Sequence, residues 1–294
     1  MRPFEGRAFS VDVTVSARTD VGRSRDHNED RFLVADLTTR DASFRPDGRK
    51  FPLGPKGCLL LVADGMGGAQ GGEVASQMAV DLIYERLSTT WANDPDSTVE
   101  LFGSRVREAV ENANTLIYER SNRSVDLRGM GSTATAVGIL DGFLLVSQVG
   151  DSRAYLIRNG LAFQLTRDQS FVQRMLDTGR ITEEQANRMP TKNIILQALG
   201  PSPTLEVVET RHPVLRGDKV LLCSDGLSGL VEAAEIATVV TEEDDLSAAC
   251  QRLVDLSNAR GGPDNITVVI ACVTGNGLTP PEGVSPGDEP EVVG

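Results

Sequence analysis

Four aspartates in this sequence stand where an apolar, strand-like run breaks off. Asp64 follows LLLVA, Asp151 follows FLLVSQVG, Asp225 follows KVLLCS, and Asp264 comes just before ITVVIACV. Carboxylates at strand ends can converge at one edge of a sheet, and gathered oxygen ligands are what Mg²⁺ or Mn²⁺ requires. The pattern therefore predicts a strand-rich metalloenzyme.

Length and charge narrow the class further. The chain has 294 residues, of which 40% are hydrophobic, so it can bury a large core. Candidate ligands run from Asp30 to Asp264 without an intervening linker, which favours one catalytic domain over residues 1–274. The Pro-, Gly- and acid-rich residues 275–294 are expected to form a disordered tail. A net charge of −13 argues against nucleic acid or an anionic membrane as partner.

Cysteine usage and hydropathy indicate the compartment. The four cysteines are scattered and show no CxxC spacing, so buried free thiols in a reducing compartment are expected. The N-terminal MRPFEGRAFS has no apolar core of a signal peptide, and no stretch reaches the ~18 apolar residues that a membrane span needs. We expect a cytoplasmic, monomeric protein without a membrane span.

The first half of the chain predicts short strands followed by two helices. Strands are expected over residues 11–18, 32–35 and 58–63, with the polar segment 37–57 as a surface loop or a long excursion between neighbouring strands. Apolar residues then recur at helical spacing over 72–87 and again up to Ile117, the second helix starting at a capping box from Ser97 to Glu100.

The second half predicts more strands and further helices. Asp141-Gly142 and Asn159-Gly160 lie between strand-like runs, so residues 133–166 are expected to form an antiparallel meander. Helices are expected within 170–189, where Thr182 to Gln185 offers a capping box, and over 232–240 and 246–258, with strands at 205–210 and 219–224. Antiparallel strands interleaved with helix pairs favour an α+β layered fold.

Two short motifs suggest chemistry. In Asp64-Gly65-Met66-Gly67-Gly68 a strand runs into glycines that open a helix, so the Gly65 carbonyl can join the Asp64 carboxylate on a metal ion. Arg25 precedes Glu29 and Asp30 at short spacing, and its guanidinium can bind phosphate oxygens bidentately.

Taken together, these residues resemble the bacterial form of the PPM (type 2C) family of metal-dependent serine/threonine protein phosphatases. The match runs from Thr19 to about Val273. It comprises, in order, R-x-x-x-ED from Arg25, ADGMGG, GEVAS, GMGSTA, GDSRAYL, LTRDQSFV, CSDGL and GGPDNITVV. Each piece is short, but eight pieces in register are specific.

The resemblance implies an αββα four-layer sandwich, two antiparallel sheets flanked by pairs of helices, with a two-metal centre of Mn²⁺ or Mg²⁺ between the sheets. It implies that Asp64 bridges both ions with help from the Gly65 carbonyl, that Asp225, Asp264, Glu29 and Asp30 complete the site, that Arg25 clamps the substrate phosphate, and that Asp151 helps hold a possible third ion.

The implied reaction is hydrolysis of phosphoserine or phosphothreonine by a metal-bridging hydroxide, without a covalent phospho-enzyme. The implied setting is signalling, with phosphorylated proteins as substrates and a cognate bacterial Ser/Thr kinase. Two alternatives remain open: a phosphohydrolase of small phosphoesters, and a pseudophosphatase that binds phosphoproteins without turnover.

This sequence departs from the family pattern at a few positions. Some relatives have a histidine where Met66 stands, and a thioether cannot donate a proton, so a metal-bound water or His27 would protonate the leaving group. Asn193 stands where a flap serine often supports the third ion. The flap, Gln169 to Gly200, is expected either to gate substrate or to be an ordinary surface helix pair.

Overall fold

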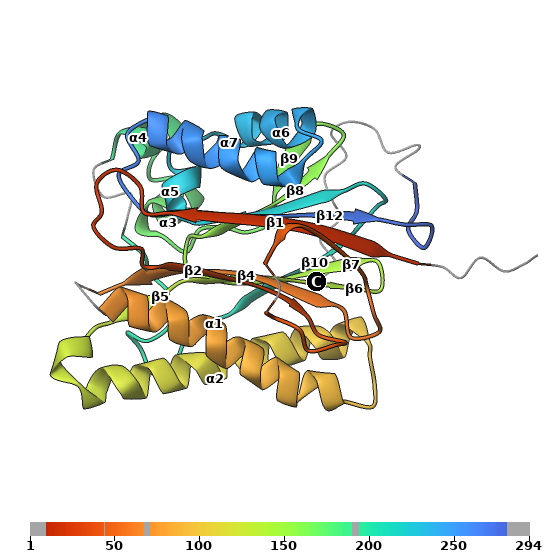
Figure 1. The fold of residues 1–294 in the computed structure, drawn as a ribbon. Helices are drawn as coiled ribbons and strands as arrows, with labels where there is room; N and C mark the ends of the chain where they lie inside the picture. The colour runs from red at the N-terminus through yellow and green to blue at the C-terminus, as the bar shows by residue number, and fades with distance from the viewer. Residues whose placement is uncertain (1–9, 44, 68–70, 190–193, 281–294) are drawn as a thin grey trace, which may run out of the picture.

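The computed structural model describes residues 10–43, 45–67, 71–189 and 194–280. Two antiparallel sheets lie face to face, and helices cover the outer face of each sheet (Figure 1). The α+β class and the four-layer αββα arrangement implied by the resemblance are confirmed.

The first sheet has the strand order β3 (Asp47–Pro52), β1 (Asp12–Asp20), β12 (Ile266–Thr274), β11 (Lys219–Cys223), β8 (Arg153–Arg158) and β9 (Leu161–Gln164). The second has the order β10 (Val208–Pro213), β7 (Phe143–Val149), β6 (Ala134–Leu140), β4 (Cys58–Met66) and β2 (Asp30–Asp36), and the short β5 (Gly131–Ser132) pairs with β4.

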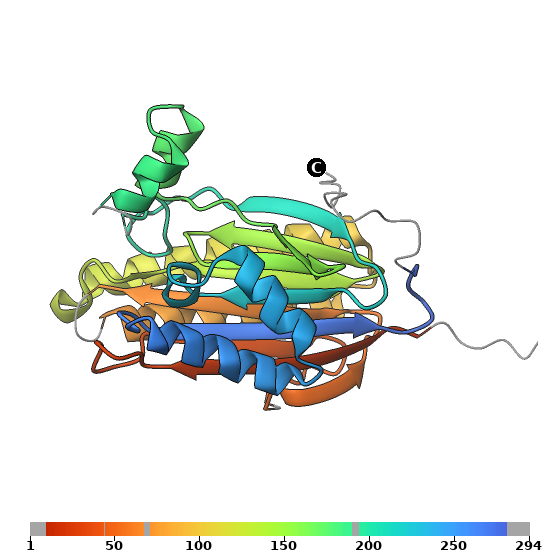
Figure 2. The same cartoon turned by 90° about the horizontal axis from the view of Figure 1, so that it is seen from above.

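The helices fall into three groups. Helices α1 (Gly71–Thr89) and α2 (Val99–Arg123) pack on the second sheet, whereas α5 (Asp225–Ser228), α6 (Ala233–Glu242) and α7 (Leu246–Ala259) pack on the first. Helices α3 (Phe171–Asp177) and α4 (Glu183–Arg188) stand away from both layers, as Figure 2 shows in green. Two short 3₁₀ turns, η1 (Trp91–Asn93) and η2 (Val125–Leu127), flank α2.

The core is built in three layers because the central strands are apolar on both faces. In β4, Leu59 and Leu61 pack against α1 and α2, whereas Leu60 and Val62 pack between the two sheets. Such a strand appears in the sequence as a continuous apolar run rather than an alternating one. A third apolar layer lies under α6 and α7.

Three local predictions need correction. Residues 133–166 form no single meander, because the β6–β7 hairpin belongs to one sheet and the β8–β9 hairpin to the other. The segment 37–57 is not only loop, since it contains β3, which pairs with β1 through backbone hydrogen bonds. The charged side chains of β3 give no strand-like pattern in the sequence, so this strand was not predicted. The cap of α2 is Thr98 rather than Ser97, whereas the capping box of Thr182 and Gln185 is confirmed.

The ordered domain continues beyond residue 274. Leu278 is buried among the side chains between the sheets, and Arg216 binds back to this segment through the carbonyls of Gly275 and Leu278. Residues 281–294 of the predicted tail lie outside the described residues. Among the helices in the described ranges, none is both long and apolar enough to cross a bilayer.

An ion pair buried at the end of the sandwich ties β8 to β11. The Nε and Nη2 atoms of Arg158 donate to Asp218 at 2.9 and 2.6 Å, and the Asp218 carboxylate also accepts from the Leu215 amide. The two side chains are only 7% and 2% exposed, so water could not solvate either charge if its partner were removed.

We therefore expect Asp218→Ala to destabilise the fold strongly. Removing one partner of a buried pair leaves an uncompensated charge and costs about 3–5 kcal/mol of unfolding free energy, measurable by urea denaturation. The control is Glu119→Ala, which breaks the exposed Arg123–Glu119 pair and should cost under about 0.5 kcal/mol. Equal, small losses for both variants would contradict a structural role for the buried pair.

Candidate functional site

The acidic residues singled out in the sequence come from the ends of strands in both sheets. Asp64 lies near the end of β4, directly opposite Asp30 in β2. Asp225 follows β11 at the start of α5, Asp264 precedes β12, and Asp151 lies in the turn between β7 and β8. The sandwich therefore brings together side chains that are far apart in the sequence.

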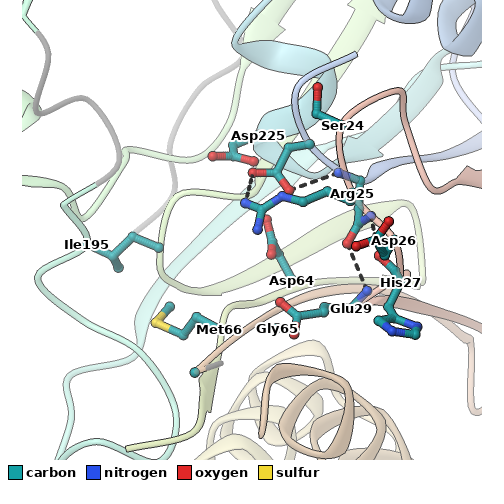
Figure 3. Close-up of a pocket in the computed structure, with 13 residues that line it drawn as sticks. Ser24, Arg25, Asp26, His27, Glu29, Asp64, Gly65, Met66, Ile195 and Asp225 are labelled. Carbon is teal, nitrogen blue, oxygen red and sulfur yellow. Dashed lines mark hydrogen bonds and ion pairs between the residues drawn. The ribbon is translucent and has the colours of Figure 1, made fainter. Parts of the chain in front are cut away.

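Most of these side chains line one pocket of about 550 Å³. Its lining includes Arg25, Glu29, Asp64, Gly65 and Asp225, which Figure 3 labels, and also Asp264. Asp151 lines an adjoining cavity that shares Arg25, Asp225 and Asp264 with the first. Asp30 is 1% exposed and does not line either cavity, but its charge still acts on Asp64. All of the predicted site residues thus belong to one electrostatic cluster.

Asp30 is held by one hydrogen bond and left open on its other oxygen. Its Oδ2 accepts from the Ser224 hydroxyl at 2.7 Å, while its buried Oδ1 has no hydrogen-bond partner. Burial raises the pKa of Asp30 to about 7, and the hydrogen bond from Ser224 only partly opposes that shift. A buried carboxylate oxygen without a partner is costly unless a cation or a proton meets it.

The other buried aspartates also have raised pKa values. Burial raises the pKa of Asp151 to about 7 and that of Asp225 to about 6, with further increases from the charges of Asp225 and Asp264 respectively. The pKa of Asp64 is raised well above its ordinary value by burial and by the surrounding aspartates. The buried Oδ1 of Asp151, like that of Asp30, has no hydrogen-bond partner.

Gly65 is required by the close approach of two chain segments. Its amide donates to the Glu29 carbonyl, and a side chain there would place Cβ 2.1 Å from the Gly72 carbonyl oxygen. The Glu29 carboxylate lies against Gly72 at the start of α1, where the helix dipole favours negative charge. Glu29 is therefore positioned beside Asp64 by the tight packing of β2, β4 and α1.

Arg25 is paired with one of the acidic residues. Its Nη2 donates to Asp264 Oδ2 at 2.7 Å, and its side chain is 50% exposed at the pocket mouth. The guanidinium was predicted to bind substrate phosphate. In this structure it binds a predicted metal ligand, Asp264, and half of its side chain remains exposed at the pocket.

Three residues that hold the site were not given a role from the sequence. Asn265 accepts from the Glu29 amide and donates to the carbonyls of Val21 and His27, so it fixes the Arg25 loop beside Asp264. Thr133 holds the backbone of Asp64 through its hydroxyl and amide. Ser224 binds Asp30. Their signal in the sequence is a polar residue at a strand end, inside the matched motifs.

The donor set fits divalent cations. Every side chain in the cluster other than Arg25 is a carboxylate, the ligand type that Mg²⁺ and Mn²⁺ prefer, and two buried oxygens lack partners. Within the described ranges, however, no three acidic, His or Cys side chains lie close enough to form a ready-made ligand group. Because the like charges repel one another, small side-chain movements toward a cation would be needed to complete a site.

The remaining residues singled out in the sequence lie at or near the pocket, in the core, or outside the described ranges. His27 is exposed on the rim and Met66 lines the pocket on the side of Ile195, as Figure 3 shows. Asn193, the position compared with a flap serine, lies outside the described residues. All four cysteines are free, and Cys58, Cys223 and Cys250 are buried as predicted, whereas Cys272 is half-buried.

Comparison with known proteins gives consistent matches. Residues 39–267 match the family described as Protein phosphatase 2C. The serine/threonine phosphatase stp of Listeria innocua is 37% identical over 253 residues, which cover 86% of this chain and 93% of that protein.

Solved structures of bacterial serine/threonine phosphatases also superpose on this chain. The serine/threonine phosphatase PstP/Ppp of Mycobacterium tuberculosis superposes with a TM-score of 0.73 at 34% identity, covering 89% of this chain and 98% of that one. The catalytic domain of the phosphatase PstP in complex with two manganese ions has a TM-score of 0.72 at 33% identity, covering 90% and 99% of the two chains.

The raised pKa values predict an unusual dependence of stability on pH. Asp30, Asp151 and Asp225 titrate near 6 to 7 when folded, above the ~4 of an unfolded aspartate, so the folded state binds more protons between these values. The contribution of these groups to stability is therefore present below about pH 4 and is lost as the pH rises through about 7.

In EDTA, the melting temperature should fall by at least about 4 °C between pH 5 and 7.5, and Mn²⁺ should restore it at pH 7.5. Asp30→Asn should flatten this decline and weaken the stabilisation by Mn²⁺, while Asp141→Asn in the β6–β7 hairpin should change neither. A metal-free melting temperature that rises across this window would refute the electrostatic account.

Proposed function

This chain belongs to the protein phosphatase 2C family, and from that premise we propose how its acidic pocket works as a metal-dependent protein serine/threonine phosphatase. The enzyme removes phosphate from phosphorylated serine and threonine side chains of proteins, and its cofactor is Mn²⁺ or Mg²⁺.

The observation that carries the mechanism is the convergence of uncompensated carboxylates. Asp30 and Asp151 each bury an oxygen without a partner, and the charges of neighbouring aspartates raise the pKa of Asp64. Natural folds rarely retain such a cluster unless cations offset it. A site of this kind is suited to chemistry on phosphate, whose own negative charge would otherwise be repelled.

Divalent ions, when bound, supply the Lewis acidity that turns water into a nucleophile at neutral pH and offset charge on the phosphoryl oxygens. Asp64 and the Gly65 carbonyl would hold the core pair of ions together with Glu29, Asp30, Asp225 and Asp264. Asp151, in the adjoining cavity, would hold a weaker third ion. The hydrogen bonds from Ser224 and Thr133 keep Asp30 and Asp64 in place for this role.

Arg25 would exchange partners on substrate binding. Its guanidinium now compensates Asp264, and a cation at that carboxylate would take over this task. The guanidinium, exposed at the pocket mouth, would then bind two phosphate oxygens and orient the phosphorus for in-line attack. Asn265 holds the Arg25 loop against Asp264, so the exchange needs little backbone movement.

Protonation of the leaving serine or threonine oxygen falls to a group other than Met66, since a thioether has no proton to give. The His27 imidazole lies exposed on the rim, on the same loop as Arg25.

The setting is also a proposal. A substrate phosphorylated on serine or threonine requires a Ser/Thr kinase, which is the partner activity that this enzyme opposes. Four free cysteines suit a reducing compartment, so we place the enzyme in the cytoplasm. Both sheets are covered by helices or by each other, which favours a monomer.

The decisive variant is Asp64→Asn. Loss of this central charge should lower Mn²⁺-dependent turnover of a phosphothreonine peptide by at least about 10³-fold, because the metal-generated nucleophile is lost. Far-UV circular dichroism should show an intact fold, and Asp141→Asn should keep wild-type turnover. A near wild-type kcat for Asp64→Asn at saturating Mn²⁺ would exclude the proposed centre.

Arg25→Ala separates a substrate role from a structural one. Losing a bidentate contact to a phosphate dianion should lower kcat/KM by a factor that corresponds to about 2–4 kcal/mol of lost binding free energy, mainly through a higher KM. Arg23→Ala, which removes an exposed neighbour outside the pocket, is the matched control. Unchanged kcat/KM together with a lower melting temperature would show that Arg25 serves only to neutralise Asp264.

A further inference from the structure

Helix α3 has an apolar face that the core does not cover. None of its seven residues, all of which are described, is buried. Val172 and Leu176 lie four positions apart, on one face of the helix, and both are only half-buried. Together with α4, the helix projects from the body of the protein (Figure 2). An apolar helix face without a core partner indicates that something else packs there.

This face lines a cavity of about 640 Å³, the groove that separates α3 and α4 from the segment joining α5 to α6. Val172, Leu176 and Ala186 line it from the α3–α4 side, and Leu230, Val231 and Ala233 from the other. The volume is typical of cavities that bind small ligands or single side chains. Each wall therefore contributes three apolar side chains, and polar residues, among them Gln164, Gln173 and Glu232, line the groove as well.

The charged residues that line the groove do not favour an acidic ligand. Arg153 donates from Nε and Nη2 to Asp168 at 2.8 and 2.6 Å, and from Nη1 to the Tyr155 hydroxyl. Arg25, the other cation in the lining, is paired with Asp264. Acidic residues outnumber these two arginines in the lining, which also includes Asp151, Asp225 and Glu232, so the groove favours an aliphatic side chain over an acidic one.

The groove is continuous with the catalytic pocket. Arg25, Asp225 and Asp264 line both cavities. A phosphorylated side chain placed on Arg25 therefore leaves the neighbouring residues of its own chain at the mouth of the groove. An extended peptide advances ~3.3 Å per residue, so a side chain within about four residues of the phosphoresidue can reach the groove.

We propose that this groove binds an aliphatic side chain of the phosphoprotein substrate, close in sequence to the phosphorylated residue. The inference rests on the proposed protein phosphatase function and adds a substrate class to it: phosphoproteins with leucine or a similar residue beside the phosphorylation site. The site is formed by α3 and by the segment between α5 and α6.

The test uses phosphothreonine peptides with a glycine- and alanine-based sequence in which leucine is moved through the four positions on either side. At one position, leucine should raise kcat/KM with Mn²⁺ by about 10-fold or more over glycine, the gain expected for burying one aliphatic side chain. Glutamate at that position should give no gain. A larger gain from glutamate than from leucine would overturn the proposal.

Two near-isosteric variants examine the groove itself. Leu176→Asn and Val172→Thr should bring the leucine-to-glycine ratio of kcat/KM close to one. Leu161→Asn, at an exposed aliphatic residue in the β8–β9 hairpin, should retain the wild-type ratio. Because α3 buries none of its side chains, the groove variants should fold. If both keep the wild-type leucine preference, the groove is not the binding site.

Failure of this inference can be distinguished from failure of the proposed function. Turnover of all phosphopeptides without a preference for leucine at any position would overturn the groove proposal and leave the protein phosphatase activity standing. Hydrolysis of a small aryl phosphate with no turnover of any phosphopeptide would overturn the protein phosphatase proposal, and the groove proposal with it.

Discussion

Mutual repulsion among buried carboxylates is the constraint on which this structure depends. Asp30 and Asp64 lie opposite each other on neighbouring strands, and the charges of Asp225 and Asp264 add to the field around them. A fold that gathers these groups loses stability unless cations or protons meet them. The same repulsion therefore lowers the stability of the metal-free protein and favours the binding of divalent cations, as is common at functional sites.

The sandwich is what makes this gathering possible. Strand ends from two sheets meet at one edge, so β4 contributes Asp64 while the segments around β11 and β12 contribute Asp225 and Asp264. Small polar residues then fix the carboxylates: Ser224 reaches across from one sheet to Asp30 in the other. Such links explain how the first layer of side chains is held before any ion binds.

The sequence predicted the strand-end aspartates and most elements, because continuous apolar runs and capping residues are local signals. It could not show that the β6–β7 and β8–β9 hairpins join different sheets, since Asp-Gly and Asn-Gly turns fix a hairpin but not its neighbours. The strand β3 was missed because its exposed, charged residues carry no apolar pattern. The pairing of Arg25 with Asp264 joins residues 239 positions apart, and no local spacing encodes it.

Net charge bears on how such an enzyme recognises its substrates. With a formal charge of −13, long-range electrostatics disfavour acidic phosphoproteins, and the attraction available at the pocket comes from Arg25 and the bound cations. Binding of an aliphatic side chain in the groove along α3 does not depend on charge. Because the groove contacts a part of the substrate that does not react, its contribution is made equally in the ground and transition states. It should therefore act on KM and on the choice among phosphoproteins, while the carboxylate cluster sets kcat.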